Sequence, residues 1–133
     1  MGDVVNINSK RNGYVRYLHK TGWEKGCKVK GKWNGFYEHL GILPNSNITC
    51  YGRGNFDMGL KVGRWEITYL DINKHNSIQV HTGRYDKGKR HGLWIIAQFG
   101  KVIEERSYEK GKLIKNEIIL KALGKKDDER EKE

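Results

Sequence analysis

The 133-residue sequence has one proline, two cysteines and no long apolar run. Cys27 and Cys50 have no neighbouring cysteine or histidine at zinc-site spacing, so we expect free thiols in a reducing, intracellular compartment, cytoplasmic by default. No stretch approaches the roughly 18 to 20 apolar residues that cross a bilayer, and the first residues lack a signal-peptide core. We therefore expect neither a membrane-spanning nor a secreted protein.

Apolar residues are also scarce, at 36% of the chain, and the mean hydropathy is -0.82. Such a composition suits a disordered chain, but four Trp, seven Tyr and three Phe recur at regular places. The length suits one domain. Together these features predict one thin domain with an aromatic face.

Glycines recur in pairs four residues apart. The pairs are Gly31 and Gly35, Gly59 and Gly63, and Gly88 and Gly92; in a fourth, Gly111 is followed by Lys115. The leading glycines are 28, 29 and 23 residues apart, which is the range of repeat architectures. We expect all seven glycines to form the reversals of β-hairpins, because such turns need a positive φ.

Aromatic residues flank these glycines at fixed distances. Tyr37, Trp65 and Trp94 follow the second glycine by two residues, and Phe56, Tyr85 and Tyr108 precede the leading glycine by three. Aromatics at one register of a repeat usually pack between neighbouring hairpins, and we favour that interpretation. The alternative is a stacking platform for single-stranded nucleic acid.

Alternating apolar residues predict the strands between the turns. The clearest alternation is in 64–70, whereas 93–99 is apolar on both faces and predicts a strand covered on two sides. Gly100 and Lys101 predict a tight hairpin into 102–108. Further strands are expected at 14–19, 36–40, 48–56 and 78–85, with Gly52, Gly54 and Gly83 as bulges or points of close backbone approach. Segments 41–48 and 70–77 are expected loop insertions.

The C-terminal residues predict a different element. Ile114, Ile118, Ile119, Ala122 and Leu123 have the spacing of one face of a short helix ending at Gly124. We expect this helix to cover the open end of the sheet, as terminal units of repeat proteins require. The expected organisation is thus an N-terminal segment at 1–12, hairpin repeats at 13–115, and the capping helix with a charged tail at 116–133.

The segment from Tyr85 to Trp94, YDKGKRHGLW, resembles the MORN repeat, and 100–111 is similar to its bacterial-style variant. The resemblance covers about residues 31–115. It implies a string of β-hairpins in one long twisted antiparallel sheet with an aromatic face, used as a scaffold for protein contacts and not for catalysis. The insertions before Ile48 and Ser77, and Lys115 in place of glycine, depart from the pattern.

The net charge of +10 is concentrated in two basic zones, at 1–34 and 85–116. Such a field favours acidic partners. We expect a protein partner with an acidic surface in a larger assembly, because an open sheet has unpaired edges and an aromatic face. Nucleic acid and anionic lipid are the alternatives. The expected contact surface comprises Tyr37, Trp65, Trp94, Lys89, Arg90 and His91.

We expect no catalytic site, metal or cofactor. His91 is expected in a turn without a nucleophile or carboxylate beside it, and the five histidines share no metal-ligand spacing. The segment from Gly26 to Lys32 copies part of a phosphate-binding loop, but Trp33 stands where that loop needs Ser or Thr. The sequence therefore predicts an interaction module.

Overall fold

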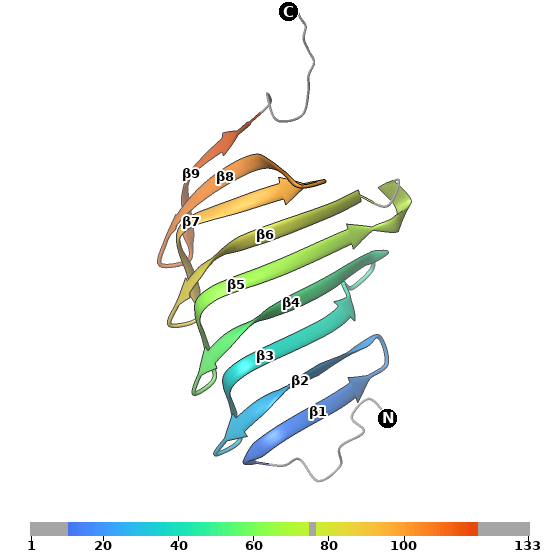
Figure 1. Cartoon of the computed structure of the whole chain (residues 1–133), viewed down its shortest axis with the longest axis vertical. Helices are drawn as coiled ribbons and strands as arrows, with labels where there is room; N and C mark the ends of the chain where they lie inside the picture. Colours follow the sequence, from blue (N-terminus) through green and yellow to red (C-terminus); the bar gives the residue numbers. More distant parts are fainter. Residues whose placement is uncertain (1–10, 75–76, 120–133) are drawn as a thin grey trace, which may run out of the picture.

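The computed structural model describes residues 11–74 and 77–119. These residues form nine strands and one short 3-10 helix: β1 (Gly13–His19), β2 (Gly22–Val29), β3 (Lys32–Ile42), β4 (Ile48–Asp57), β5 (Leu60–Asp71), η1 (Ile72–Lys74), β6 (Ser77–Asp86), β7 (Lys89–Gln98), β8 (Lys101–Glu109) and β9 (Lys112–Ile118). Every strand pairs antiparallel with the next, so the strands follow the chain order across one open sheet (Figure 1). The predicted all-β fold with a single antiparallel sheet is confirmed.

Four two-residue turns are stacked along the left edge of the sheet in Figure 1, which we call the turn edge. In Lys30–Gly31, Met58–Gly59, Lys87–Gly88 and Lys110–Gly111 the first residue has φ of 46–52° and the glycine has φ of 80–90°. Two successive positive φ values are the geometry of a type I′ hairpin turn. The leading glycines thus occupy the turn position that only glycine adopts without strain.

Each of these glycines also bonds to the repeat before it. The amide nitrogens of Gly59, Gly88 and Gly111 donate to the carbonyl oxygens of Trp33, Lys61 and Arg90 at 2.8 Å, and Gly31 donates to Arg11 at 2.9 Å. The acceptor always lies on the turn edge of the preceding repeat. These bonds stack the turns in one file and fix the spacing of the repeats.

The second glycines do not lie in the turns, contrary to expectation. Gly35, Gly63 and Gly92 lie within β3, β5 and β7, with φ of 96°, 68° and 74°. On β5 and β7 they begin three-residue bulges, 63–65 and 92–94, each opposite one glycine of the neighbouring strand. The bulge bends the strand, which re-aims the tryptophan that ends it.

The glycine opposite each bulge makes room for that tryptophan. A Cβ added at Gly54 or Gly83 would lie closer than 3.0 Å to the indole of Trp65 or Trp94. Each indole nitrogen donates to the backbone carbonyl after that glycine, Trp65 to Asn55 at 3.0 Å and Trp94 to Arg84 at 3.1 Å. Gly54 and Gly83 are therefore points of close approach opposite the bulges and not bulged residues themselves. Gly52 is a further close approach, because its Cβ would collide with the His39 ring.

The structure contradicts three details of the sequence prediction. Segment 93–99 is covered on one side only, since Leu93 is 51% and Phe99 is 73% exposed. His91 lies in β7, opposite Arg84, and not in the turn. The predicted helix is wrong at Ile114 and Ile118, which lie in strand β9, so the sheet passes the expected boundary at residue 115. The rest of that predicted helix, from residue 120, lies outside the described residues.

Candidate interaction surface

The rings that recur at the same position in each repeat form one continuous stack, which we call the aromatic ladder. We call the face of the sheet that carries this stack the inner face. Successive ring centroids are 4.8 to 6.4 Å apart and meet edge to face, in the order Tyr37, Phe56, Trp65, Tyr85, Trp94 and Tyr108. Edge-to-face contacts at these separations are favourable for aromatic pairs. The rings pack between neighbouring hairpins, as expected from their register.

Burial changes what the ladder can do. Tyr37, Trp65 and Trp94 are 8%, 1% and 0% exposed, so these three members of the expected contact surface are packing residues in this structure. Their faces are not open to stacking bases. A partner must therefore contact the residues that cover the ladder or lie beside it.

Cations cover the ladder near the turn edge. The Lys61 ammonium lies 5.0 and 5.1 Å from the ring centres of Trp65 and Tyr85. The Arg90 guanidinium lies 4.3 and 5.6 Å from those of Trp94 and Tyr108. Cations over ring faces are stabilising. Each cation contacts one ring of its own strand, four residues later, and one ring of a neighbouring strand, and the second contact cannot be read from the sequence alone.

The hairpin of β2 and β3 also has a ring and a cation facing each other across its turn, but in the reverse order. Phe56 faces Lys61 and Tyr85 faces Arg90 across their turns, with the ring before the turn and the cation after it. In β2 and β3, Lys28 comes before the turn and faces Trp33 after it, and the ammonium lies 4.8 Å from the ring centres of both Trp33 and Tyr17. The order of ring and cation at this cross-strand pair is therefore reversed between the hairpin of β2 and β3 and the next two turn-edge hairpins.

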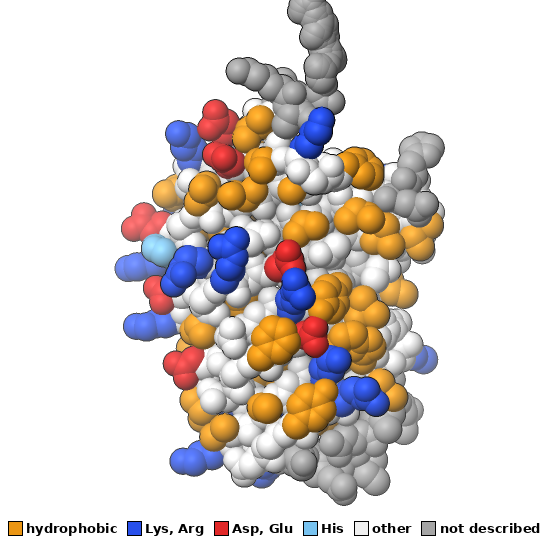
Figure 2. Space-filling model, viewed as in Figure 1, with side chains coloured by type: hydrophobic (Ala, Val, Ile, Leu, Met, Phe, Trp, Pro, Cys, Tyr) orange, Lys and Arg blue, Asp and Glu red, His pale blue; other side chains and the backbone are white. Residues whose placement is uncertain are grey.

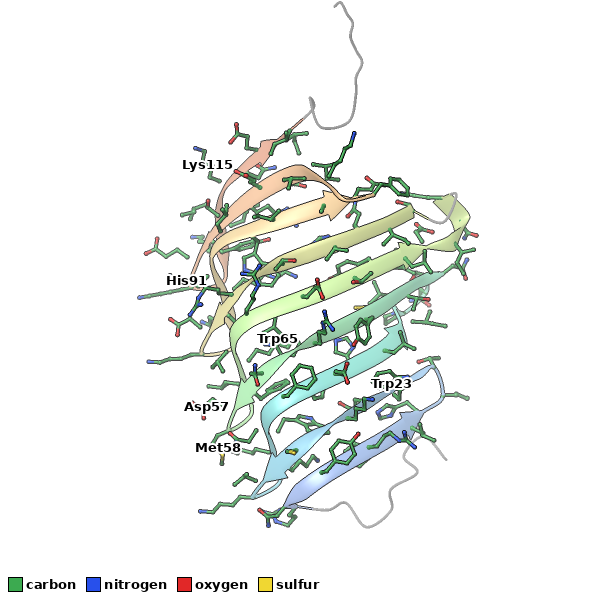
Figure 3. All side chains as sticks on the ribbon, in the orientation of Figure 1. Trp23, Asp57, Met58, Trp65, His91 and Lys115 are labelled. Atoms are coloured by element: carbon green, nitrogen blue, oxygen red, sulfur yellow. The ribbon has the colours of Figure 1, made fainter. Side chains whose placement is uncertain are left out.

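The turn edge gathers several basic residues from each of the two zones. A lysine stands on either side of three turn glycines: Lys30 and Lys32, Lys87 and Lys89, and Lys110 and Lys112. Met58 and Leu60 take these places at the remaining turn. Figure 2 shows blue side chains along this edge, and Figure 3 shows His91 pointing away from the sheet there. Lys89 and His91 are exposed and Arg90 is half-buried. The expected basic contact residues thus lie together.

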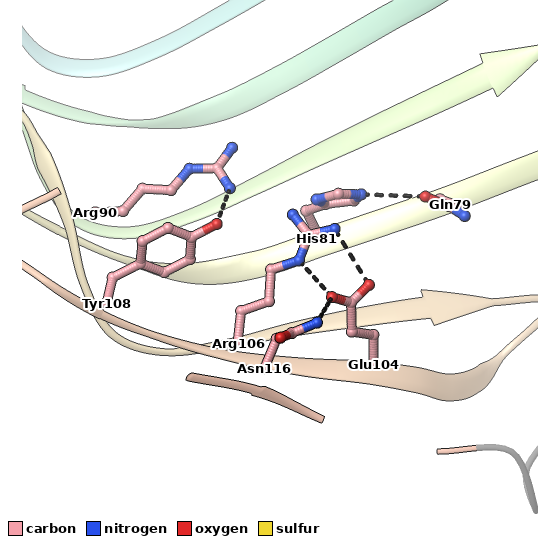
Figure 4. A network of polar contacts seen from close by, with 7 residues as sticks. All are labelled: Gln79, His81, Arg90, Glu104, Arg106, Tyr108 and Asn116. Atoms are coloured by element: carbon pink, nitrogen blue, oxygen red, sulfur yellow. Dashed lines mark hydrogen bonds and ion pairs between the residues drawn. The ribbon is translucent and has the colours of Figure 1, made fainter. Parts of the chain in front are cut away.

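A polar network occupies the inner face over the last strands (Figure 4). Arg106 donates to both oxygens of Glu104 at 2.8 and 3.1 Å, and the Asn116 amide donates to Glu104 at 3.2 Å. The Arg106 hydrogen bond is the main reason that the Glu104 pKa lies below its usual value, and the Arg106 pKa is raised by the same bond. Glu104 and Arg106 therefore neutralise each other, so neither charge is left for binding a substrate.

His81 is the buried titratable group beside this network. Its side chain is 8% exposed, Nε2 lies 3.3 Å from the Gln79 oxygen, and Nδ1 has no partner. Burial, then the charges of Arg106 and Arg90, lower its pKa to about 4, so the ring is neutral near pH 7. Among the described residues, no carboxylate orients this ring and no hydroxyl or thiol bonds to it, as a catalytic base would require.

A second polar chain lines a hollow on the inner face of β2 and β3. His19 Nε2 is 2.8 Å from one oxygen of Glu24, and the Tyr37 hydroxyl donates to the other at 2.7 Å. Burial and this hydrogen bond raise the Tyr37 pKa, so the phenol stays protonated. Burial lowers the pKa of His39, which lines the same hollow. The carboxylate is used to hold Tyr37 in the ladder.

Other features of the described residues add no chemistry. Cys27 is exposed, Cys50 is buried, and both thiols are free. Between residues 11 and 119, apart from 75 and 76, no group of three or more His, Cys, Asp and Glu is close enough to hold a metal, and no helix there is long and apolar enough to cross a bilayer.

Comparisons with protein-family models, with curated proteins and with solved structures find no match. The resemblance to the MORN repeat therefore depends on the residues quoted for it and remains a prediction.

Proposed function

We propose that this chain is a non-catalytic, MORN-like repeat module that acts as a protein-contact scaffold or accessory subunit of a larger assembly. The observation that carries the proposal is the single-layer sheet, in which only the inner face has a packed core. Exposed faces and unpaired edges of this kind are surfaces that a partner can cover.

The outer face presents an apolar row to such a partner. Side chains alternate between the faces of a strand, so the residue before each buried member of the ladder row points outward. At that place stand Phe36 and Leu93, which are 54% and 51% exposed, while Arg64 occupies it in β5. On β1, Tyr14 is 56% exposed and likewise precedes a buried residue, Val15. Large exposed apolar residues in register are typical of interaction surfaces.

The charge distribution supports an acidic protein over nucleic acid. The turn edge supplies cations for phosphates, but the rings that would stack on bases are buried under those cations. Anionic lipid would meet the same cations, but it would leave the apolar row of the outer face uncovered. A protein can use the apolar row and the basic edge together.

Co-purification tests the proposal. The tagged native protein is recovered from its source cell at rising salt, with and without nuclease, and the retained molecules are identified. We expect a protein partner that survives moderate salt and nuclease. Recovery of nucleic acid alone, released steeply as salt rises, would support the alternative, because counterion release makes that affinity strongly salt-dependent. Turnover of a small substrate by the purified chain would contradict the proposal.

A further inference from the structure

A shallow groove lies on the inner side of the turn edge, between the last two turns. It is lined by Lys61, Tyr85, Gly88, Lys89, Arg90, Lys110, Gly111 and Lys112. Five of these residues are cations and none is a carboxylate. The charged side chains that line this groove are therefore all positive.

These cations are not neutralised by the rest of the sheet. Three described strand cations pair with carboxylates: Lys25 with Glu38 at 3.5 Å, Arg53 with Glu66 at 2.8 Å and Arg106 with Glu104 at 2.8 Å. None of the five groove cations has an ion pair within the described residues. Their charge is therefore available to a ligand.

Two of the cations are held in place by the ladder. Lys61 lies over Trp65 and Tyr85, and Arg90 lies over Trp94 and its guanidinium is 3.5 Å from the Tyr108 hydroxyl. The Lys89 stem packs on the open side of Gly111, 3.4 Å from where its Cβ would be. A preorganised cation loses less conformational freedom on binding an anion than a free surface lysine does.

Two half-exposed leucines adjoin residues that line the groove, although they do not line it themselves. Leu60 precedes Lys61 and is 49% exposed, and Leu113 follows Lys112 and is 48% exposed. Leu60 packs against the Gly88 turn, 3.3 Å from its Cβ position, and Leu113 faces Tyr108 across β8 and β9. Fixed cations beside half-exposed leucines suit carboxylates interspersed with apolar side chains, which a phosphate backbone does not offer.

We infer that this groove is the docking site for an acidic segment of the partner protein, with its carboxylates on Lys61, Lys89, Arg90, Lys110 and Lys112 and its apolar side chains on Leu60 and Leu113. The inference rests on the proposed function and assigns its contact to one place on the sheet.

The test measures binding of a short fluorescein-labelled peptide of Glu, Asp and Leu by anisotropy. The variant Lys110→Gln with Lys112→Gln removes two groove charges from exposed positions. The matched control, Lys20→Gln with Lys101→Gln, removes two exposed charges from the opposite edge. We expect the first pair to weaken binding at least about fivefold and the control pair less than about twofold, since exposed charge contacts are individually small.

Each outcome separates the groove from the broader proposal. Equal losses in both pairs would show that the field of the whole protein attracts the peptide, which would overturn the groove while leaving a protein partner intact. Absence of peptide binding, together with a co-purified protein whose retention is unaffected by the groove variant, would do the same. Tighter binding of single-stranded DNA of equal charge, or of phosphatidylserine vesicles, would overturn both. Unchanged thermal unfolding of the variants establishes that they fold.

Discussion

Replacing Gly83 with alanine tests how the ladder is built. The added methyl group would lie closer than 3.0 Å to three atoms of the Trp94 indole. That ring is 0% exposed, packs edge to face between Tyr85 and Tyr108, and donates from its nitrogen to Arg84. The indole therefore cannot move aside without breaking these contacts.

The expected cost follows from two opposing effects. Adding a methylene-sized group to a packed site costs about 1 to 3 kcal/mol, and alanine regains about 0.5 to 1 kcal/mol over glycine in a strand. Because Trp94 is enclosed on every side, we expect a net loss near the upper end, about 2 kcal/mol. Urea unfolding followed by tryptophan fluorescence measures it.

Gly41→Ala is the matched control, because its Cβ would meet only the Thr21 carbonyl at 3.9 Å. We expect that variant to be neutral or slightly stabilised. Trp94→Leu in the Gly83→Ala background should recover part of the alanine penalty, which a double-mutant cycle resolves. Equal stability of Gly83→Ala and Gly41→Ala would refute the packing of the indole on Gly83.

Three further variants or conditions test other parts of the sheet. The pKa of His81 is about 4 in the folded protein and 6.5 for the free side chain, so between these pH values only the unfolded chain binds the proton. We therefore expect the free energy of unfolding to fall by about 3 kcal/mol from pH 7 to pH 4. Urea titrations at several pH values should show this fall, and the variant His81→Phe should reduce it. Gly88→Ala should cost about 1 to 2 kcal/mol, because φ there is 85° and the left-handed conformation penalises a Cβ; an unchanged midpoint would contradict the I′ turn. The variant Trp33→Lys should be destabilised. Adding Lys28→Tyr should restore about 1 kcal/mol of stability, because the double variant has the ring before the turn and the cation after it, as in the later hairpins. Additive losses would show that the two positions are not interchangeable.

The sequence could predict the strands and hairpins because their signals are local. The alternation of 64–70 appears in β5 with Trp65 and Ile67 buried. A tight hairpin joins 93–98 to β8 as expected, but its turn residues are Phe99 and Gly100 and not Gly100 and Lys101. Leading glycines could be placed for the same reason, since a I′ turn needs positive φ within two residues. The spacing of neighbouring residues was sufficient for all of these.

The wrong predictions came from features that depend on neighbouring strands. Ile114 and Ile118 are four residues apart, a spacing that puts side chains on one face of a strand as well as of a helix, and a register shift between β8 and β9 leaves Ile114 unpaired. Leu93 and Phe99 were expected under a second layer, but a single sheet exposes them. Helical periodicity over a few residues cannot be distinguished from a bulged strand without knowing the partner.

Across the sheet, buried rings alternate with glycines from one strand to the next, and this alternation was missed in the sequence for a related reason. Gly26, Gly54 and Gly83 each lie five residues before a leading glycine, and Arg106 takes that place before Gly111. The spacing is present in the sequence, but its meaning depends on register, which places Gly26 opposite Tyr37 and brings the bulged Trp65 and Trp94 over Gly54 and Gly83. Cross-strand pairing therefore brings glycines and rings that are far apart in the sequence into contact across the sheet.

Proton NMR tests the glycine and tryptophan stack most directly. One Hα of Gly54 and one of Gly83 point at the indole faces of Trp65 and Trp94, since a Cβ in the same direction would enter those rings. We predict strong upfield ring-current shifts for these two protons and cross-relaxation with the indoles, and ordinary shifts for Gly41. Ordinary shifts at all three glycines would contradict the aromatic ladder and the fold built on it.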